Sequence, residues 1–203
     1  MHYLLMRDSI HGAMKSDIKL VGKDLLYNGS STRLLPGAAP GSIPWDAFDV
    51  DIVIDSTGAY RKREELQMHI DSGAKRVLVS KPPVYEIDRI VIQGINEDQI
   101  DNNDSLISTT SSTTQVLALM MKVLDESFGI NRAMMTTVHA YTSDQPLADA
   151  VRSDLRRSRS AVENIIPNET WAPDYVSQLM PKFKDKISGI AMNVPVANGS
   201  CID

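Results

Sequence analysis

The amino-acid sequence predicts an α/β protein built on a parallel sheet. Three observations in the first half support this class. A Val- and Ile-rich run at residues 49–54 ends at the turn sequence Asp55-Ser56-Thr57-Gly58. A charged segment of helical character follows at residues 61–72, and a second apolar run occupies residues 75–79. Strand, helix and strand at this spacing form the βαβ unit, whose two strands lie parallel.

The charged segment at residues 61–72 is interpreted as a surface helix. Its few apolar side chains are placed among charged ones, as in a helix with one face toward the protein. Gly73 follows directly and is expected to end the helix, because glycine adopts the backbone conformation of helix C-termini without strain. The apolar positions are Leu66, Met68 and Ile70.

The other elements of the first half are strands. Residues 49–54 are interpreted as a buried strand that runs into a tight turn. The strand at residues 75–79 is stopped by Lys81-Pro82-Pro83, since proline cannot donate to a sheet ladder. Two further short strands are predicted at residues 90–92 and 106–108.

The second half begins with a predicted helix at residues 112–128. The hydroxyl side chains of residues 111–114 can cap its N-terminus, and Gly129 is expected to end it. Strands are predicted at residues 134–138, leading into His139, and at residues 190–196. The apolar residues of the helix form one broad stripe that is expected to face a core. They are Val116, Leu117, Leu119, Met120, Val123 and Leu124.

Composition excludes several classes of protein. No apolar run approaches the roughly 18 residues of a membrane-spanning helix, and the N-terminus lacks the pattern of a secretory signal. A single cysteine, Cys201, is expected to be a small buried residue and allows neither an internal disulfide nor a CxxC metal site. A net charge of −5 argues against nucleic acid as the main partner. We expect a cytoplasmic protein without a metal site, in which the basic stretch at residues 152–159 is a solvated loop.

Eight short motifs occur in an order and at a spacing that resemble the glyceraldehyde-3-phosphate dehydrogenase family. Each motif alone is a weak signal, but the ordered set extends over essentially the whole chain. The motifs are Asp8-Ser9-Ile10-His11-Gly12, Ile43-Pro44-Trp45, Asp55-Ser56-Thr57-Gly58, His69-Ile70-Asp71-Ser72-Gly73-Ala74-Lys75, Ser111-Ser112-Thr113-Thr114-Gln115, Thr136-Thr137-Val138-His139-Ala140-Tyr141-Thr142 with Asp144-Gln145, Asp154-Leu155-Arg156-Arg157 and Asn164-Ile165-Ile166-Pro167.

The resemblance implies a doubly wound, Rossmann-like NAD-binding domain at residues 1–111, followed by part of an α+β catalytic domain at residues 112–203. Family members begin with a strand and a Gly-rich turn that receives the dinucleotide pyrophosphate. No such turn is present here, so we expect an internal piece of a longer family member, with a natural minimal protein left open. The choice between NAD and NADP would be made upstream of Met1. The complete protein is expected to be a homotetramer, in which residues 152–159 reach a neighbouring subunit.

The resemblance also assigns catalytic roles. In the family a cysteine thiolate at a helix N-terminus attacks an aldehyde, with a histidine as base. Ser112 occupies the cysteine position here, and His139 matches the histidine. A serine hydroxyl has a far higher pKa than a thiol, and a helix dipole lowers it by only about one unit, so low activity is expected. The main alternative interpretation of Ser112 is a plain helix N-cap without a functional role. A misread codon, a deliberate replacement of cysteine and a natural serine enzyme are the other interpretations left open.

Phosphate-binding residues are both retained and changed. Ser111 and Thr113 match the inorganic-phosphate pocket of the family, and Thr142 matches a threonine that holds the substrate phosphate; Thr170 is retained beside them. Asn193 replaces an arginine that would clamp phosphate through two hydrogen bonds. The small Ser-Thr-Gly turn of the family is Glu169-Thr170-Trp171 here, which opposes a phosphate by charge and by volume. Together these changes favour a lost or altered phosphorylated substrate.

The cofactor residues implied by the resemblance follow the first predicted strands. Ser56, Thr57 and Gly58 would flank the adenine and ribose of the dinucleotide, with Tyr60 and Ser80 nearby. Ligands bind at this end of the strands in open α/β sheets. The alternative interpretation is a turn that merely ends a strand.

The function implied is therefore NAD-dependent oxidation of a phosphorylated aldehyde with inorganic phosphate, as in glycolysis, impaired or re-specialised by Ser112, Asn193 and Trp171. The main alternative is a non-catalytic pseudoenzyme that keeps the fold for binding or assembly. A second alternative is a dehydrogenase for another aldehyde.

Overall fold

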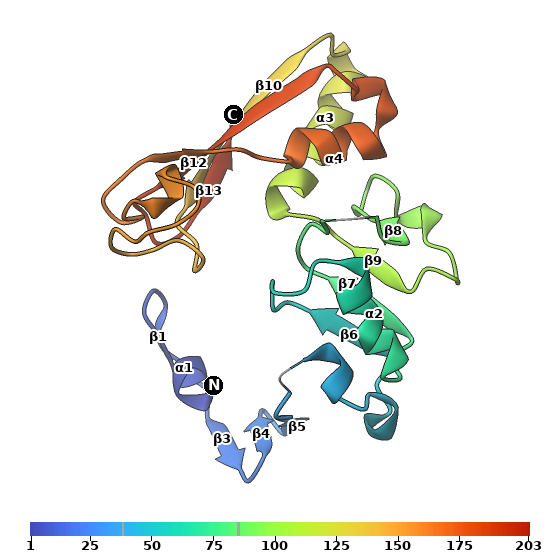
Figure 1. Cartoon of the computed structure of the whole chain (residues 1–203), viewed down its shortest axis with the longest axis vertical. Helices are drawn as coiled ribbons and strands as arrows, with labels where there is room; N and C mark the ends of the chain where they lie inside the picture. Colours follow the sequence, from blue (N-terminus) through green and yellow to red (C-terminus); the bar gives the residue numbers. More distant parts are fainter. Residues whose placement is uncertain (38, 85) are drawn as a thin grey trace. The chain divides into compact units, whose positions relative to one another are not determined.

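The computed structural model of the protein describes residues 1–37, 39–84 and 86–203 (Figure 1). The chain forms two compact units, Met1–Ile43 and Pro44–Asp203. We describe each unit by itself. The domain boundary expected after residue 111 lies inside the second unit and stays a prediction.

The first unit consists of one short helix and small antiparallel sheets. Helix α1 (His2–Met6) precedes the two-stranded pair β1 (Arg7–Asp8) and β2 (Gly12–Ala13). A three-stranded antiparallel meander follows. Its last two strands are joined by the two-residue turn Asn28-Gly29, in which both residues have positive φ (46° and 82°), as a tight hairpin requires. The strands of the meander are β3 (Ile18–Val21), β4 (Asp24–Tyr27) and β5 (Ser30–Arg33). Neither helix nor strands of this unit were expected from the sequence.

The parallel sheet expected from the sequence is present in the second unit. Its strand order is β6-β7-β9-β8, and every pair is parallel. Helix α2 (Arg63–Asp71) connects β6 to β7 and forms the predicted βαβ unit. The strands are β6 (Ile52–Asp55), β7 (Arg76–Val79), β8 (Arg89–Ile90) and β9 (Leu106–Ser108). The α/β class is confirmed.

Packing under α2 explains both the helix and its end. Leu66 is fully buried in a cluster with Val77, Val79 and Leu106 from two strands. Gly73 has φ of +104°, and a Cβ there would lie 2.6 Å from the Cβ of Asp46, so glycine is required at this turn.

The interpretation of residues 49–54 as a buried strand is only half right. Burial alternates along β6, where Val53 and Asp55 are buried while Ile52 and Ile54 are exposed. Alternating exposure means that one face of this strand is covered and the other is open in the part of the chain that the structure describes.

The second sheet of this unit is mixed, with strand order β11-β12-β10-β13. Strands β10 (Ala133–Ala140) and β12 (Ile187–Val194) are parallel over eight residues each, whereas β11 (Ile166–Asn168) and β13 (Ser200–Ile202) are antiparallel to their neighbours. The predicted strands at 134–138 and 190–196 correspond to β10 and β12, and His139 lies within β10 rather than after it. Cys201 lies on the edge strand β13 and is exposed, so its expected burial is wrong.

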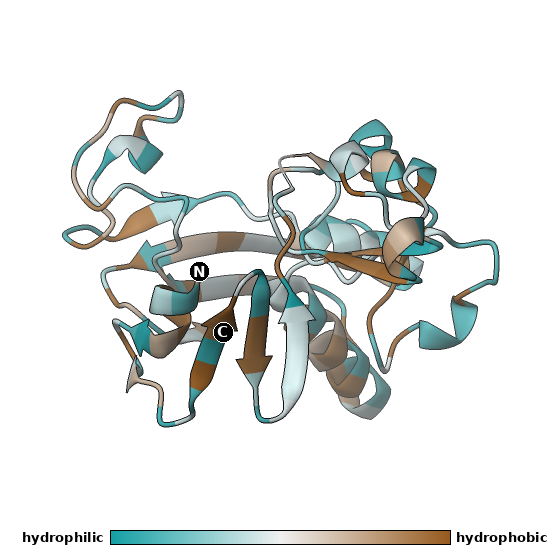
Figure 2. Ribbon diagram, turned by 90° about the horizontal axis from the view of Figure 1, so that it is seen from below, coloured by the Kyte–Doolittle hydropathy of each residue, from teal (hydrophilic) through white to brown (hydrophobic). Residues whose placement is uncertain are grey.

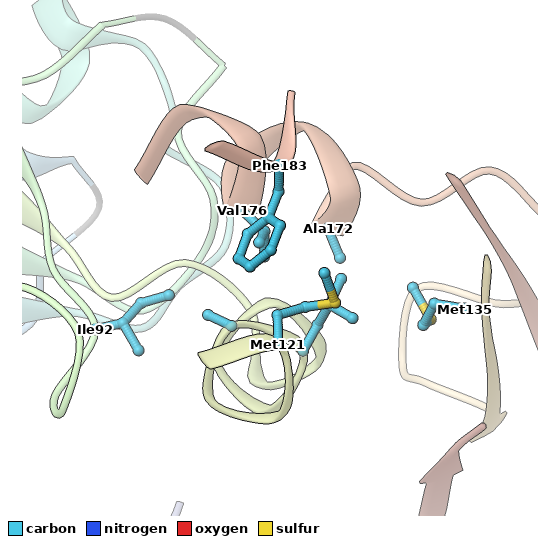
Figure 3. Close-up of a cluster of buried hydrophobic side chains, with 8 residues drawn as sticks. Ile92, Met121, Met135, Ala172, Val176 and Phe183 are labelled. Carbon is cyan, nitrogen blue, oxygen red and sulfur yellow. The ribbon is translucent and has the colours of Figure 1, made fainter. Parts of the chain in front are cut away.

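Helices α3 (Ser112–Phe128) and α4 (Ala172–Leu179) contact each other and pack against this sheet. Figure 3 shows side chains from both helices and from β10 in one apolar cluster, joined by Ile92 from an earlier segment. The bounds of α3 agree with the sequence prediction, and Gly129 ends it with φ of +71°. Helix α4 was not predicted. The buried members of the cluster are Ile92, Leu117, Ala118, Met121, Met135, Ala172, Val176 and Phe183.

The apolar stripe predicted on α3 is only partly correct. Leu117 faces the core together with Ala118 and Met121. The other five members of the stripe lie on the exposed side of the helix in the described structure. Helical spacing identifies which residues share a face, but not which of two apolar faces is covered. The exposed members are Val116, Leu119, Met120, Val123 and Leu124.

Hydrophobic and hydrophilic stretches alternate along the ribbon (Figure 2). Short 3-10 turns connect the helices and strands of both units. None of the helices in the described residues is long and apolar enough to traverse a lipid bilayer. The turns are η1 (Pro40–Ser42, in the first unit), η2 (Asp46–Phe48), η3 (Glu97–Gln99), η4 (Arg156–Ser158) and η5 (Pro181–Phe183).

Candidate functional site

A cavity of about 360 Å³ lies at the N-terminus of α3, and we call it the His139 cavity. Its wall combines residues from α3, from the neighbouring strands β10 and β12, and from the loops that follow β10 and β11. The lining includes Ser111, which directly precedes α3; Thr113 and Thr114 of α3; Thr137 and His139 of β10; Asn193 of β12; and Arg61, Thr142, Arg157, Glu169, Thr170 and Trp171.

A larger cavity of about 560 Å³ lies between α4 and residues 83–84 and 86–90. Its lining contains no histidine, cysteine, serine or threonine among the described residues. Two of its charged residues, Asp88 and Arg89, are already engaged in ion pairs, with Arg63 and Asp104 respectively. Chemistry therefore favours the smaller His139 cavity as the candidate site.

Ser111, not Ser112, caps helix α3. The Ser111 hydroxyl accepts a hydrogen bond of 3.1 Å from the Thr114 backbone N–H and lies 2.8 Å from the Thr114 hydroxyl. The N-cap interpretation of Ser112 is therefore wrong, because Ser112 is the first residue inside the helix. Its side chain is exposed and makes no hydrogen bond within the described residues. Thr113, the next residue, lines the cavity.

His139 is fixed in one tautomer by its own strand. Its Nδ1 lies 2.8 Å from the carbonyl oxygen of Ala140. A carbonyl can only accept a hydrogen bond, so Nδ1 carries the proton of the neutral ring and Nε2 keeps its lone pair. The half-buried ring lines the cavity and is thus suited to accept a proton there. No hydrogen bond joins His139 to Ser112 in the part of the chain that the structure describes.

Thr142 and Arg157 meet at one carboxylate. The Thr142 hydroxyl donates to Asp144, and the Arg157 guanidinium forms an ion pair with the other oxygen of the same side chain. Partial burial acts to raise the pKa of Asp144, but the Thr142 hydroxyl and the Arg157 charge outweigh it and lower that pKa. Asp144 is therefore ionised at neutral pH and offsets the charge of Arg157.

The positions that depart from the family pattern lie in the same wall. Asn193 is the register partner of His139 across the β10–β12 ladder and donates a 3.4 Å hydrogen bond to the Ala140 carbonyl. Asn168 donates to the Asn193 side-chain oxygen. Trp171 and Glu169 line the cavity and are exposed to solvent, and the Thr170 hydroxyl between them accepts a hydrogen bond from the Ala172 N–H at 3.3 Å.

The residues expected to hold a cofactor lie at the carboxyl ends of β6 and β7. The Thr57 N–H and hydroxyl both donate to Asp55, at 2.9 and 2.7 Å, and the Ser80 N–H donates to the Asp55 carbonyl at 3.0 Å. Ser56 and Gly58 complete the turn. The structure thus brings Ser56, Thr57, Gly58 and Ser80 together, with half-buried Tyr60 two residues beyond, but none of these five lines the His139 cavity.

Several residues of the lining were not singled out as site residues in the sequence, among them Arg61, Arg157 and Thr137. Arg61 was assigned to a surface helix, yet it precedes α2, is half-buried and lines the cavity. Arg157 belongs to the basic stretch interpreted as a solvated loop, and that stretch instead contains the turn η4 and places this guanidinium at the site. Thr137 is an ordinary strand residue. Only tertiary structure distinguishes these side chains from their neighbours.

Comparison with known proteins gives one consistent family. A family model for the glyceraldehyde 3-phosphate dehydrogenase NAD-binding domain matches residues 1–63, and the model for the C-terminal domain of the same enzymes matches residues 111–203. Glyceraldehyde-3-phosphate dehydrogenase of Streptomyces coelicolor is 44% identical over 202 residues, and two such enzymes from Bacillus subtilis and Geobacillus stearothermophilus are 42% identical. These alignments cover 99% of this chain and 60% of each relative, so the chain spans about three fifths of their length.

Proposed function

Because the chain belongs to the glyceraldehyde-3-phosphate dehydrogenase family, we propose that it serves NAD-dependent oxidation of an aldehyde in the His139 cavity. The observation that carries this proposal is the tautomer of His139, whose Nε2 lone pair is available beside the N-terminus of α3. Glyceraldehyde 3-phosphate and inorganic phosphate are the proposed substrates, as for the relatives. The proposed setting is cytoplasmic glycolysis.

The proposed reaction uses two residues of this chain directly. The Ser112 hydroxyl adds to the aldehyde carbon, and its proton moves to Nε2 of His139. After oxidation the acyl group is an ester of Ser112, which phosphate attacks; the serine oxygen leaves and recovers its proton from His139. Backbone N–H groups at the α3 N-terminus and the Thr113 side chain are suited to hold the phosphate.

The position of the turn at residues 55–58 supports the proposal that a dinucleotide binds there. It lies at the carboxyl ends of two adjacent parallel strands, where ligands bind in open α/β sheets. Gly58 has φ of +68°, a backbone conformation that residues with a side chain rarely adopt, so glycine is favoured at this position of the turn. NAD, when bound, supplies the hydride acceptor; Ser56, Thr57, Gly58, Tyr60 and Ser80 are the residues proposed to hold it.

We expect the rate of this chain to be low as its sequence stands. The Ser112 hydroxyl has no base within hydrogen-bond distance among the described residues, and its pKa lies far above that of a thiol. Asn193 contributes no positive charge to the wall, and Glu169 adds a negative one. The same features leave a binding subunit without turnover as the second candidate.

The deciding experiment compares Ser112→Cys with the unmodified chain. NADH formation is followed with glyceraldehyde 3-phosphate and phosphate, and NAD binding is measured separately by calorimetry. We expect little turnover from the unmodified chain, turnover from Ser112→Cys, and a drop of roughly 10²-fold or more when His139→Gln is added. NAD binding without turnover in either chain would favour the binding subunit, and absence of NAD binding would contradict both.

We also propose a homotetramer, to which residues 152–159 contribute. The basis is the resemblance together with exposed basic side chains: Arg152, Arg156 and Arg159 are exposed, whereas Arg157 turns toward the cavity. Light scattering of the purified chain tests the oligomeric state.

A further inference from the structure

The His139 cavity contains two guanidinium groups whose charges are compensated differently. Arg157 forms an ion pair with Asp144. Arg61 forms no ion pair with any carboxylate of residues 1–37, 39–84 or 86–203. A half-buried cation without a counter-charge is unfavourable, and an anionic ligand would remove that cost.

The guanidinium group of Arg61 is held by a hydrogen bond from its Nε atom alone among the described residues. Its Nε donates a 3.0 Å hydrogen bond to the Pro82 carbonyl, and its backbone N–H donates to Glu65, which caps α2. The two Nη groups have no hydrogen-bond partner among the described residues. An anchored guanidinium with two unengaged amino groups is pre-organised for an oxyanion, because the planar fork matches two acceptor oxygens.

The lining of the His139 cavity also contains a buried hydroxyl group that lacks a hydrogen-bond partner. Thr137 of β10 is 3% exposed, and its Oγ1 has no hydrogen-bond partner in the described structure. Leaving a buried hydroxyl unsatisfied costs about 1–3 kcal/mol. Thr137 lines the same cavity as Arg61, so a ligand with acceptor oxygens would satisfy both groups.

The remaining charges around the cavity are consistent with such a ligand. The N–H groups of the first turn of α3 carry partial positive charge, and the helix has 17 residues. Glu169 is exposed to solvent, where water and salt screen its repulsion. Asn193 is neutral. Arg61 is therefore the cation whose charge remains available to a ligand.

We propose that Arg61 is a specificity-determining residue of the His139 cavity, which binds an oxyanion through its two Nη groups and selects ligands that carry one. The chemistry is that of phosphate, either free or as a phosphate monoester. The inference rests on the proposed function only in assigning the oxyanion to a substrate; binding itself requires neither turnover nor NAD.

The test measures phosphate binding to the full chain by isothermal calorimetry, at constant ionic strength and without NAD. Arg61→Gln is expected to raise the dissociation constant for inorganic phosphate about tenfold, since a bidentate charge-assisted contact is lost. Arg63→Gln is the matched control, because Arg63 lies two residues away, pairs with Asp88 and does not line the cavity. Its dissociation constant should stay within about twofold of that of the unmodified chain.

A second variant keeps the proposal testable if Arg61→Gln loses stability. Thr137→Val removes the unsatisfied hydroxyl at nearly constant volume. It is expected to raise the melting temperature of the free chain and also to weaken phosphate binding severalfold. A purely structural role of Thr137 would change the melting temperature alone.

Glycerol 3-phosphate, an unreactive phosphate monoester, distinguishes the two sources of the oxyanion. If Arg61→Gln weakens the ester more than inorganic phosphate, Arg61 recognises the substrate phosphate; the reverse order assigns it to the free ion. The proposal is overturned if the unmodified chain binds neither at millimolar concentration, if Arg61→Gln binds both as tightly, or if Arg63→Gln loses as much. Failure of NADH formation leaves these outcomes unaffected and counts only against the dehydrogenase.

Discussion

The hydroxyl of Tyr175 on α4 donates a 2.6 Å hydrogen bond to the carbonyl oxygen of Pro83, 92 residues earlier in the chain. This contact ties the second half of the chain to the segment that follows β7. Tyr175 and Pro83 are both buried, so losing the bond leaves a buried carbonyl without its protein donor.

We expect Tyr175→Phe to lower the free energy of unfolding by about 1–2 kcal/mol, because the Pro83 carbonyl is left unsatisfied. Urea denaturation measures the change. Burial raises the pKa of Tyr175, so its contribution is complete below its ordinary value of 10.0 and is lost as the pH rises further. The two chains should therefore converge in stability at strongly alkaline pH, and a constant difference would contradict this account.

Asp88 predicts an acid-sensitive component of stability. Burial acts to raise its pKa, but the Leu106 N–H, the Arg63 guanidinium and the Ser105 N–H and hydroxyl lower it to about 2. The folded value lies below the ordinary 3.8, so the contribution is complete above pH 3.8 and is lost as the pH falls toward 2. The shift corresponds to about 2 kcal/mol.

Asp88→Asn should remove that component of the acid dependence. Denaturation of both chains between neutral pH and pH 2 gives the comparison. We expect the unmodified chain to lose about 2 kcal/mol more than the variant over this range. Parallel acid profiles would show that the Asp88 interactions do not distinguish the folded from the unfolded chain.

The position of Ser112 predicts an activated thiol in Ser112→Cys. Position 112 is the first residue of a 17-residue helix, so the helix dipole should lower the thiol pKa below its ordinary value of about 8.5. The measurement is the pH dependence of iodoacetamide alkylation in a Cys201→Ser background. Exposed Cys201 of the unmodified chain, alkylated in a parallel experiment, is the reference. A midpoint at or above that of Cys201 would contradict the prediction.

Leu66 and Met68 on α2 form a matched pair for testing the core. Leu66 is fully buried, whereas Met68 is 41% exposed on the same helix. Leu66→Ala should cost about 2–5 kcal/mol because it leaves a cavity against Val77 and Leu106, whereas Met68→Ala should change stability by less than about 0.5 kcal/mol. Equal effects of the two substitutions in urea denaturation would contradict the burial pattern of the helix.

Local sequence signals predicted the regular elements that carry them. Helix α3 has a hydroxyl cap before it, helical spacing within it and a glycine after it, and its bounds were correct to the residue. The βαβ unit around α2 was recognised from two apolar runs and the helix between them. Strand β13 and helix α4 were missed, since the short run Ser200–Ile202 has no pattern of its own and α4 opens with Ala172-Pro173 after a tryptophan rather than a hydroxyl cap.

The site residues also divide into those with a sequence signal of their own and those without one. His139 was found because it lies in a distinctive motif, but its tautomer depends on the Ala140 carbonyl and required coordinates. Arg61 carried no signal at all, since an arginine among charged residues resembles any helix surface. Its role follows from the Pro82 carbonyl that anchors it, and that contact is 21 residues away in sequence.

The parallel ladder between β10 and β12 also has a kinetic consequence. Ala140 and Asn193 hydrogen-bond across 53 residues of intervening chain, whereas the Ser111 cap of α3 closes over three residues. Closing a long loop costs conformational entropy before the contacts at its ends compensate for the loss, so the step is slow. Proteins with many contacts between residues distant in sequence therefore fold more slowly. The wall of the His139 cavity at the N-terminus of α3 therefore forms from contacts close in sequence, whereas the wall made by β10 and β12 forms from contacts distant in sequence. A ligand that touches both walls would bind only chains that have completed this closure and would slow their reopening.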